Sequence, residues 1–259
     1  MATNLTCGPR CPRVTPFVRL WALALVVAIA LSAKLAPAKP PARTSEPLTA
    51  IDILLLPDQS MVDAAQRANA RLRKVDPTGF SLDATHRPHI TLLQRYVRTR
   101  DLPLVLAAVA EVYERQQPVG WELEATGYFY ANFNSIAVAG IVVRATPELR
   151  NLQQEIATAV APFTRAGGNA AAFVRTKAAP GINLATIEYV DRFVPNEIGD
   201  KYNPHVTIGV APIPFVEKMQ AAPFNPFHFR VAGAAVFHLG NFGTAAKELW
   251  ALQPAAVDQ

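Results

Sequence analysis

Two spacings of apolar residues recur along the chain after residue 49, one typical of strands and one typical of helices. Apolar residues alternate from Ile51 to Leu55, which predicts a strand that ends at Pro57. From Met61 to Leu72 they recur at helical spacing behind a capping-box pattern at Ser60, which predicts a helix. The same reasoning predicts strands over 88–97, 121–130, 135–144, near 173, over 203–210, 227–239 and 244–252, and helices starting near 101 and 147, over 184–194 and near 216. This mixed order favours an α+β fold over a doubly wound parallel sheet.

The first 38 residues have the three parts of an export signal. A basic stretch ends at Arg19, an apolar run covers Leu20 to Leu31, and small residues lead to Ala38. The 14 residues between Arg19 and Lys34 fall short of the roughly 20 that a membrane-spanning helix needs, so a signal peptide is favoured over a permanent membrane anchor. We expect residues 1–38 to be this signal or anchor, residues 39–48 to be a Pro/Ala-rich linker, and residues 49–259 to form the folded domain. The domain is then exported, periplasmic or extracellular, and contacts the membrane only through the N-terminal segment.

Composition excludes several classes of protein. The chain is 51% apolar, which is enough to form a core and excludes intrinsic disorder. Its net charge of +5 comes mostly from the first 38 residues, which hold four basic residues and no acid, so the composition gives no argument for a protein that coats nucleic acid. Both cysteines, Cys7 and Cys11, precede the apolar run. An exported domain would therefore have no disulfide, no Cys-based zinc site and no catalytic thiol.

One short motif occurs twice. Pro88-His89-Ile90-Thr91-Leu92 has the same pattern as Pro204-His205-Val206-Thr207-Ile208, 116 residues further on, and it contains two of the five histidines of the chain. On a strand, residues i and i+2 project from one face, so each histidine shares a face with its threonine while Ile90 and Val206 face the core. Side by side, the two strands would present two imidazoles and two hydroxyls to one volume.

This set suits the chemistry of phosphodiesters without a metal ion. A neutral imidazole can accept a proton from the attacking hydroxyl while a protonated one donates to the leaving oxygen, and threonine hydroxyls can donate to phosphoryl oxygens. The ordinary histidine pKa of about 6.5 would place both limbs of the pH profile near neutrality. No cofactor is called for, and the pattern leaves open which histidine is the acid.

Paired H-x-T motifs of this form resemble those of the two-histidine (2H) phosphoesterase superfamily, which includes bacterial 2′-5′ RNA ligases and cyclic phosphodiesterases. The resemblance covers nearly the whole chain after the linker. It implies two pseudo-symmetric lobes of mainly antiparallel β-sheet with outer helices around a central groove. It also implies that His89, Thr91, His205 and Thr207 are catalytic, as members of a phosphoric diester hydrolase or 2′-5′ RNA ligase-like site.

Other residues are weaker candidates. Tyr202 borders the second motif and is a candidate substrate contact, and Arg95 would share the face of His89 if the strand continued without a break. The spacing of His86 and His89 could suggest a metal site, but a strand sends i and i+3 to opposite faces, so no metal is predicted. The aromatic cluster around Phe129 is predicted to pack in the core or at a sheet edge rather than to stack on a base.

The sequence therefore predicts an exported, metal-independent phosphoesterase that is a monomer. The expected substrate is a nucleotide or short RNA with a cyclic phosphate or a 2′-5′ linkage. Two alternatives remain at this point: a hydrolase of another small cyclic phosphodiester, and a nucleotide-binding protein without catalytic turnover. Formation of a product would distinguish the two enzymes from the nucleotide-binding protein.

Overall fold

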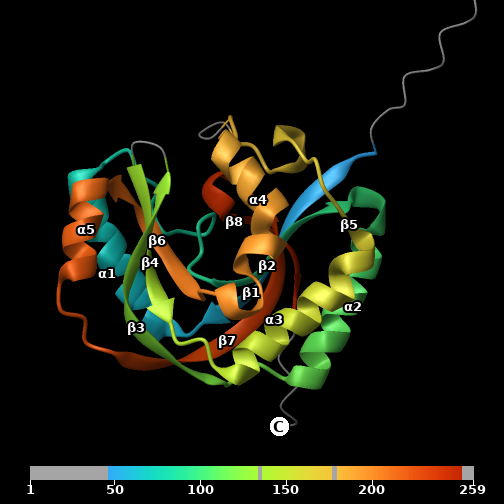
Figure 1. The fold of residues 1–259 in the computed structure, drawn as a ribbon, viewed down its shortest axis with the longest axis horizontal. Helices are drawn as coiled ribbons and strands as arrows, with labels where there is room; N and C mark the ends of the chain where they lie inside the picture. The colour runs from blue at the N-terminus through green and yellow to red at the C-terminus, as the bar shows by residue number, and fades with distance from the viewer. Residues whose placement is uncertain (1–45, 134–135, 177–179, 253–259) are drawn as a thin grey trace, which may run out of the picture. The chain divides into compact units, whose positions relative to one another are not determined.

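The computed structural model describes residues 46–133, 136–176 and 180–252 (Figure 1). The predicted signal or anchor and most of the predicted linker lie outside the described residues. The strands are β1 (Leu48–Pro57), β2 (Ile90–Arg98), β3 (Glu122–Phe133), β4 (Ile136–Val143), β5 (Thr164–Arg165), β6 (His205–Pro212), β7 (Phe227–Leu239) and β8 (Ala245–Ala251). The α-helices are α1 (Gln59–Val75), α2 (Leu102–Gln116), α3 (Pro147–Val160), α4 (Leu184–Glu197) and α5 (Ile213–Ala221).

The observed order of elements confirms the predicted α+β class, with local differences. Helix α1 begins before Ser60, because the carboxylate of Asp58 is its N-cap and accepts from the Ser60 and Met61 amides. Helix α3 has the expected cap, in which Thr146 Oγ1 accepts from the Leu149 amide at 3.2 Å. The predicted strand near residue 173 is wrong, since a short 3-10 helix over Ala170–Ala172 takes its place.

The strands form one antiparallel sheet in the order β1-β2-β6-β4-β3-β7-β8, and β5 pairs with β2. Strand β7 links two halves of this sheet. Its first residues, up to Arg230, pair with β3, and the stretch from Val231 to His238 pairs with β1. The first half contains β1 and β2, and the second contains β3, β4 and β6. Between β2 and β6 the register has a single pair, Ile90 with Val206.

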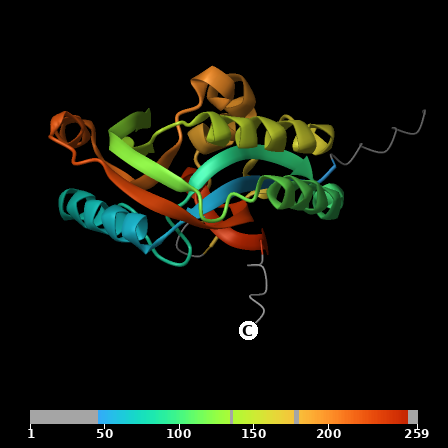
Figure 2. The ribbon, with the colours of Figure 1, turned by 90° about the horizontal axis from the view of Figure 1, so that it is seen from below.

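The helices lie outside the sheet, and the motif strand of each half is covered by a helix that follows a strand of the other half. Helix α1, which follows β1 in the chain, packs on β6, whereas α3, which follows β4, packs on β2. Figures 1 and 2 show α2 and α3 side by side at one end and α1 and α5 at the other. The core between these layers includes Ile90 and Val206, both fully buried. Among the described helices of residues 46–252, none has the length and apolar character that a membrane span requires.

Candidate active site

The pairing of β2 with β6 brings the two motifs together. Ile90 lies opposite Val206 in an antiparallel register. One residue further in each direction, this register sets His89 opposite Thr207 and Thr91 opposite His205, all on the face that points away from the core. The predicted convergence of these four residues therefore follows from a single backbone pair.

Both histidines are held by the same local hydrogen bond. His89 Nδ1 lies 2.6 Å from the Arg87 carbonyl oxygen, and His205 Nδ1 lies 2.7 Å from the Asn203 carbonyl oxygen. A carbonyl oxygen only accepts, so each Nδ1 carries the proton and donates it. The proline between acceptor and histidine in each motif fixes φ and keeps the preceding residue extended. In each ring Nε2 is therefore the nitrogen whose protonation can change.

A β-bulge follows the threonine of each motif. The register between β1 and β2 shifts at Leu92, and the register between β4 and β6 shifts at Ile208. A bulge places an extra residue in one strand and re-aims the residues after it. In β2 this turns Gln94 toward the face of Thr91 and turns Arg95 away. The hypothesis that Arg95 shares the face of His89 is wrong for this reason, and its guanidinium Nη1 donates to the Asp191 carbonyl oxygen instead.

His89 lies against a buried carboxylate that sequence reasoning missed. Its Nε2 is 3.2 Å from Asp52 Oδ2, and Asp52 on β1 is completely buried. The same oxygen accepts from Thr91 Oγ1 and from Gln94 Nε2, each at 3.0 Å. Desolvation alone would lower the pKa of His89, but the hydrogen bond and charge of Asp52, with the Arg87 carbonyl, raise this pKa above its ordinary value.

His205 lies in an apolar environment instead. The ring of Phe129 from β3 has its centroid 4.3 Å from that of His205. Gly140 on β4 pairs with Phe129, and a Cβ at this position would overlap the Phe129 ring, so glycine leaves the room that this ring occupies. Burial lowers the pKa of His205 to about 4, and the charge of His89 contributes to the shift. Phe129 is thus a neighbour of the site, a place that the predicted core or edge packing did not indicate.

Tyr202 connects the two motifs. This side chain is 6% exposed, and its hydroxyl donates to the Thr91 carbonyl oxygen at 3.0 Å. Its substrate contact stays a prediction, and the geometry favours a positioning role. The hydroxyl of Thr91 likewise donates to Asp52, so its proton is not directed at a substrate oxygen in this structure.

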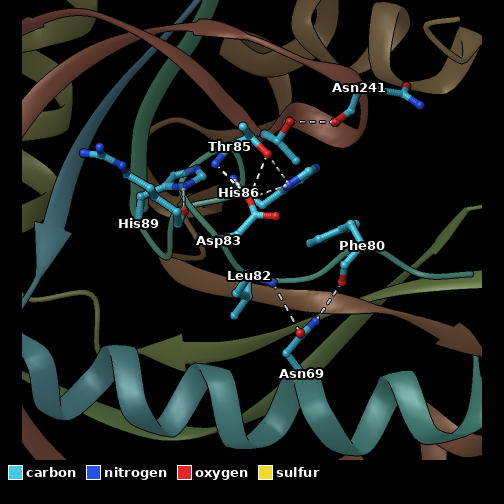
Figure 3. A network of polar contacts seen from close by, with 10 residues as sticks. Asn69, Phe80, Leu82, Asp83, Thr85, His86, His89 and Asn241 are labelled. Atoms are coloured by element: carbon cyan, nitrogen blue, oxygen red, sulfur yellow. Dashed lines mark hydrogen bonds and ion pairs between the residues drawn. The ribbon is translucent and has the colours of Figure 1, made fainter. Parts of the chain in front are cut away.

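One residue of each motif lines a small cavity, His89 from the first and Thr207 from the second. This cavity shares Phe80, His86 and Phe242 with a larger neighbouring cavity of about 870 Å³. One wall of these cavities is formed by the segment from Phe80 to His89, which Figure 3 shows. The stacked rings of Phe80 and His86 have centroids 5.0 Å apart.

The loop of this wall is ordered by a carboxylate. Asp83 Oδ1 accepts from the backbone amide of Thr85 at 2.8 Å and from its hydroxyl at 2.7 Å, and it lies 3.2 Å from His86 Nδ1 (Figure 3). His86 thus contacts Asp83, while His89 contacts Asp52. The part of the chain that the structure describes contains no group of three His, Cys, Asp or Glu side chains that could hold a metal ion.

Comparisons with known proteins give one family and two solved structures. The model of the 2′-5′ RNA ligase superfamily matches residues 61–241. The protein TT0787 of Thermus thermophilus has a TM-score of 0.48 and 16% identity, over 79% of this chain and 97% of that one. Usb1 of Kluyveromyces marxianus has a TM-score of 0.35 and 11% identity, over 78% of this chain and 97% of that one. No curated protein matches the chain.

Proposed function

The chain belongs to the 2′-5′ RNA ligase superfamily, and we propose that it hydrolyses a cyclic phosphate or a 2′-5′ phosphodiester of a nucleotide or short RNA. One observation carries this proposal. Two imidazoles, each with Nδ1 bound to a backbone carbonyl, lie on adjacent strands beside a threonine that lines the same cavity as His89. This is the arrangement that acid and base catalysis of an in-line displacement requires.

The reaction needs one proton acceptor and one proton donor. A water molecule loses a proton to the neutral imidazole as its oxygen forms a bond to phosphorus. The bond between phosphorus and the leaving ribose oxygen breaks, and the protonated imidazole gives that oxygen its proton. The product is a phosphomonoester, and proton exchange with solvent restores both imidazoles. Thr207 Oγ1 donates to a phosphoryl oxygen, where negative charge increases in the transition state.

The lining of the larger cavity favours a small substrate. Its volume of about 870 Å³ lies in the range of sites for nucleotide-sized ligands. The rings of Phe80 and Phe242 offer apolar faces, and Asp76 and Asp83 line the cavity without a Lys or Arg among its described residues. A long phosphate backbone would need cations here. A single phosphate at the histidines, with a nucleoside in the cavity, fits this distribution of charge.

We also propose that the domain is exported. The basic, apolar and small-residue parts of residues 1–38 support this proposal, and the pattern predicts that the domain lies beyond the cytoplasmic membrane. Protease added to cells with a permeabilised outer layer should digest the domain. Protection of the domain until the inner membrane is lysed would contradict export, and the N-terminal mass of the recovered protein would distinguish a cleaved signal from an anchor.

A substrate panel tests the reaction. The purified chain is incubated with 2′,3′-cyclic nucleotides, 3′,5′-cyclic nucleotides and 2′-5′ dinucleotides, and the product isomers are resolved by chromatography. We expect one phosphomonoester isomer from one of these classes. Turnover confined to a cyclic phosphodiester without a nucleoside would favour the hydrolase of another small ester, and tight binding of nucleotides without product would favour a binding protein.

A further inference from the structure

Asp52 is the one charged residue of β1. Its neighbours Ile51 and Ile53 face the core, whereas Asp52 faces the same side as Thr91 and Gln94. The carboxylate is 0% exposed and Oδ1 has no hydrogen-bond partner among the described residues. A buried carboxylate without a compensating charge is strongly destabilising. This position therefore calls for a cation beside it.

His89 is the cation that the structure offers. Among the described residues no Lys or Arg forms an ion pair with Asp52, and the side chain of Arg87 lies 3.5 Å from Glu248 instead. The Arg87 carbonyl fixes the first proton of His89 on Nδ1. Three donors converge on Asp52 Oδ2 when Nε2 also carries a proton, as expected for an ionised carboxylate that accepts several hydrogen bonds.

The other titratable groups around this pair do not supply a charge at neutral pH. They are the phenols of Tyr113 on α2, Tyr189 on α4 and Tyr202, together with the imidazole of His205. Burial raises the pKa of each of these phenols, and burial lowers the pKa of His205. His89, which contacts the Asp52 carboxylate, is thus the imidazole whose charged form the site favours, and His205 is its neutral neighbour.

We propose that Asp52 is a positioning residue that holds His89 as the imidazolium, so that His89 is the general acid and His205 the general base. This inference rests on the proposed function for its catalytic part. In the displacement described above, His205 Nε2 takes the proton of the attacking water. The His89 Nε2 proton, which lies against Asp52 Oδ2 in this structure, passes from that contact to the leaving oxygen when substrate is bound. After turnover His205 is protonated and His89 is neutral, and exchange with solvent returns both to their starting states.

A titration without substrate tests the electrostatic part. The full chain is labelled with ¹⁵N in the histidine rings, and the signals are assigned with His89→Gln and His205→Gln. We expect both ring nitrogens of His89 to be protonated at pH 7 and those of His205 to show one proton. In Asp52→Asn the His89 pKa should fall from above 6.5 to below it, because burial remains and the carboxylate is gone. Asp58→Asn removes the same charge at the end of β1 and should leave His89 unchanged.

Kinetics on the substrate found in the panel test the catalytic part. In Asp52→Asn the alkaline limb of kcat/KM should move to lower pH by as much as the His89 titration moves, with a loss of about tenfold at pH 8. A neutral His89 at pH 7 in the wild type overturns the inference even if Asp52→Asn does not fold, and so does an unchanged His89 pKa in the folded variant. Lack of turnover on every substrate, with the expected titrations, would instead count against the proposed function alone.

Discussion

The two motif strands have nearly the same sequence and different neighbours. In the first half Asp52 lies opposite Gln94, five residues after His89, on the strand next to the motif. At the corresponding pair in the second half, Val138 lies opposite Val210, five residues after His205. Each half also has its bulge directly after the threonine. The halves are therefore alike in backbone and unlike in polarity.

This difference gives the two histidines, His89 and His205, different pKa values. A carboxylate beside one imidazole favours its charged form, and an aromatic ring over the other favours its neutral form. Environments that push the pKa values of two groups apart are how one site obtains an acid and a base at the same pH. The identity of the motif residues gives the chemistry, and the residue on the neighbouring strand gives the role.

The largest expected effect on activity comes from removing either imidazole. His89→Ala and His205→Ala should each lower kcat by about 10²–10⁴-fold, and the double variant should lose much less than the product, because the two groups act in one step. Stopped assays on the substrate found in the panel measure this, with thermal melts to verify folding. His228→Ala, an exposed histidine on β7, is the matched control. Near wild-type turnover in either single variant would return that histidine to a structural role.

The two threonines should differ in the same way as their histidines. Thr207 lines the cavity, so Thr207→Val should lower kcat by about 10², the effect of losing one donor to the transition state. Thr91→Val should cost less, because the Thr91 hydroxyl donates to Asp52 rather than into the cavity. Valine keeps the β-branched shape, so the melt of Thr207→Val should change little. Thr91→Val also removes a hydrogen bond to the buried Asp52 and should melt at a lower temperature. An equal loss in both variants would show that the polar contact of Thr91 does not set its role.

The pH profile should be wider than the unperturbed histidine pKa predicts. The base His205 must be neutral, so activity falls only as pH drops through its pKa of about 4. The acid His89 must be protonated, so activity falls again as pH rises through a pKa above 6.5. A plot of kcat/KM against pH measures both limbs. Two limbs that both lie near neutrality, as the sequence alone predicts, would contradict the different environments.

Phe129 sets the acid limb of that profile. Phe129→Ala hydrates His205, which should raise its pKa toward 6.5 and move the acid limb to higher pH, while the alkaline limb stays in place. Tyr128→Ala is the control on the same strand, since the Tyr128 ring packs edge-on against Phe224. An acid limb that does not move in Phe129→Ala would show that the ring does not keep His205 neutral.

The smallest expected effect is that of a chelator. Neither half contributes a group of metal-ligating side chains within the described residues, and the mechanism assigns every proton to an imidazole. Dialysis against EDTA should therefore leave kcat/KM unchanged within error. Loss of activity that one divalent cation restores would reject the two-histidine mechanism.

The fold was largely predictable because apolar periodicity is a local property. The strands from Phe227 and near Ala245 and the helix at Pro147 start within a residue or two of their predicted positions. The segment near Phe173 was not predictable in this way. It is too short for a period, and its buried ring packs edge-on against Tyr96, which is distant in sequence.

The site was predictable only as far as its motif repeats. His89 and His205 were found from two like sequences, but Asp52 lies 37 residues before His89 and has no counterpart in the second half. A lone acid in the run Ile51 to Leu55 was the available signal. The bulge at Leu92 carries no such signal, and without it alternation assigns Arg95, rather than Gln94, to the site.

The exchange of helices between the halves has a consequence for cooperativity. Helix α1 covers β6 and α3 covers β2, while β7 pairs with strands of both halves. Neither half can bury its own motif strand alone, so an isolated half has no native state of its own. Unfolding should then occur in one transition, in which protection of the amides on both sides of the Ile90 and Val206 pair is lost together. Loss of the site and loss of the fold are thus a single event in this chain.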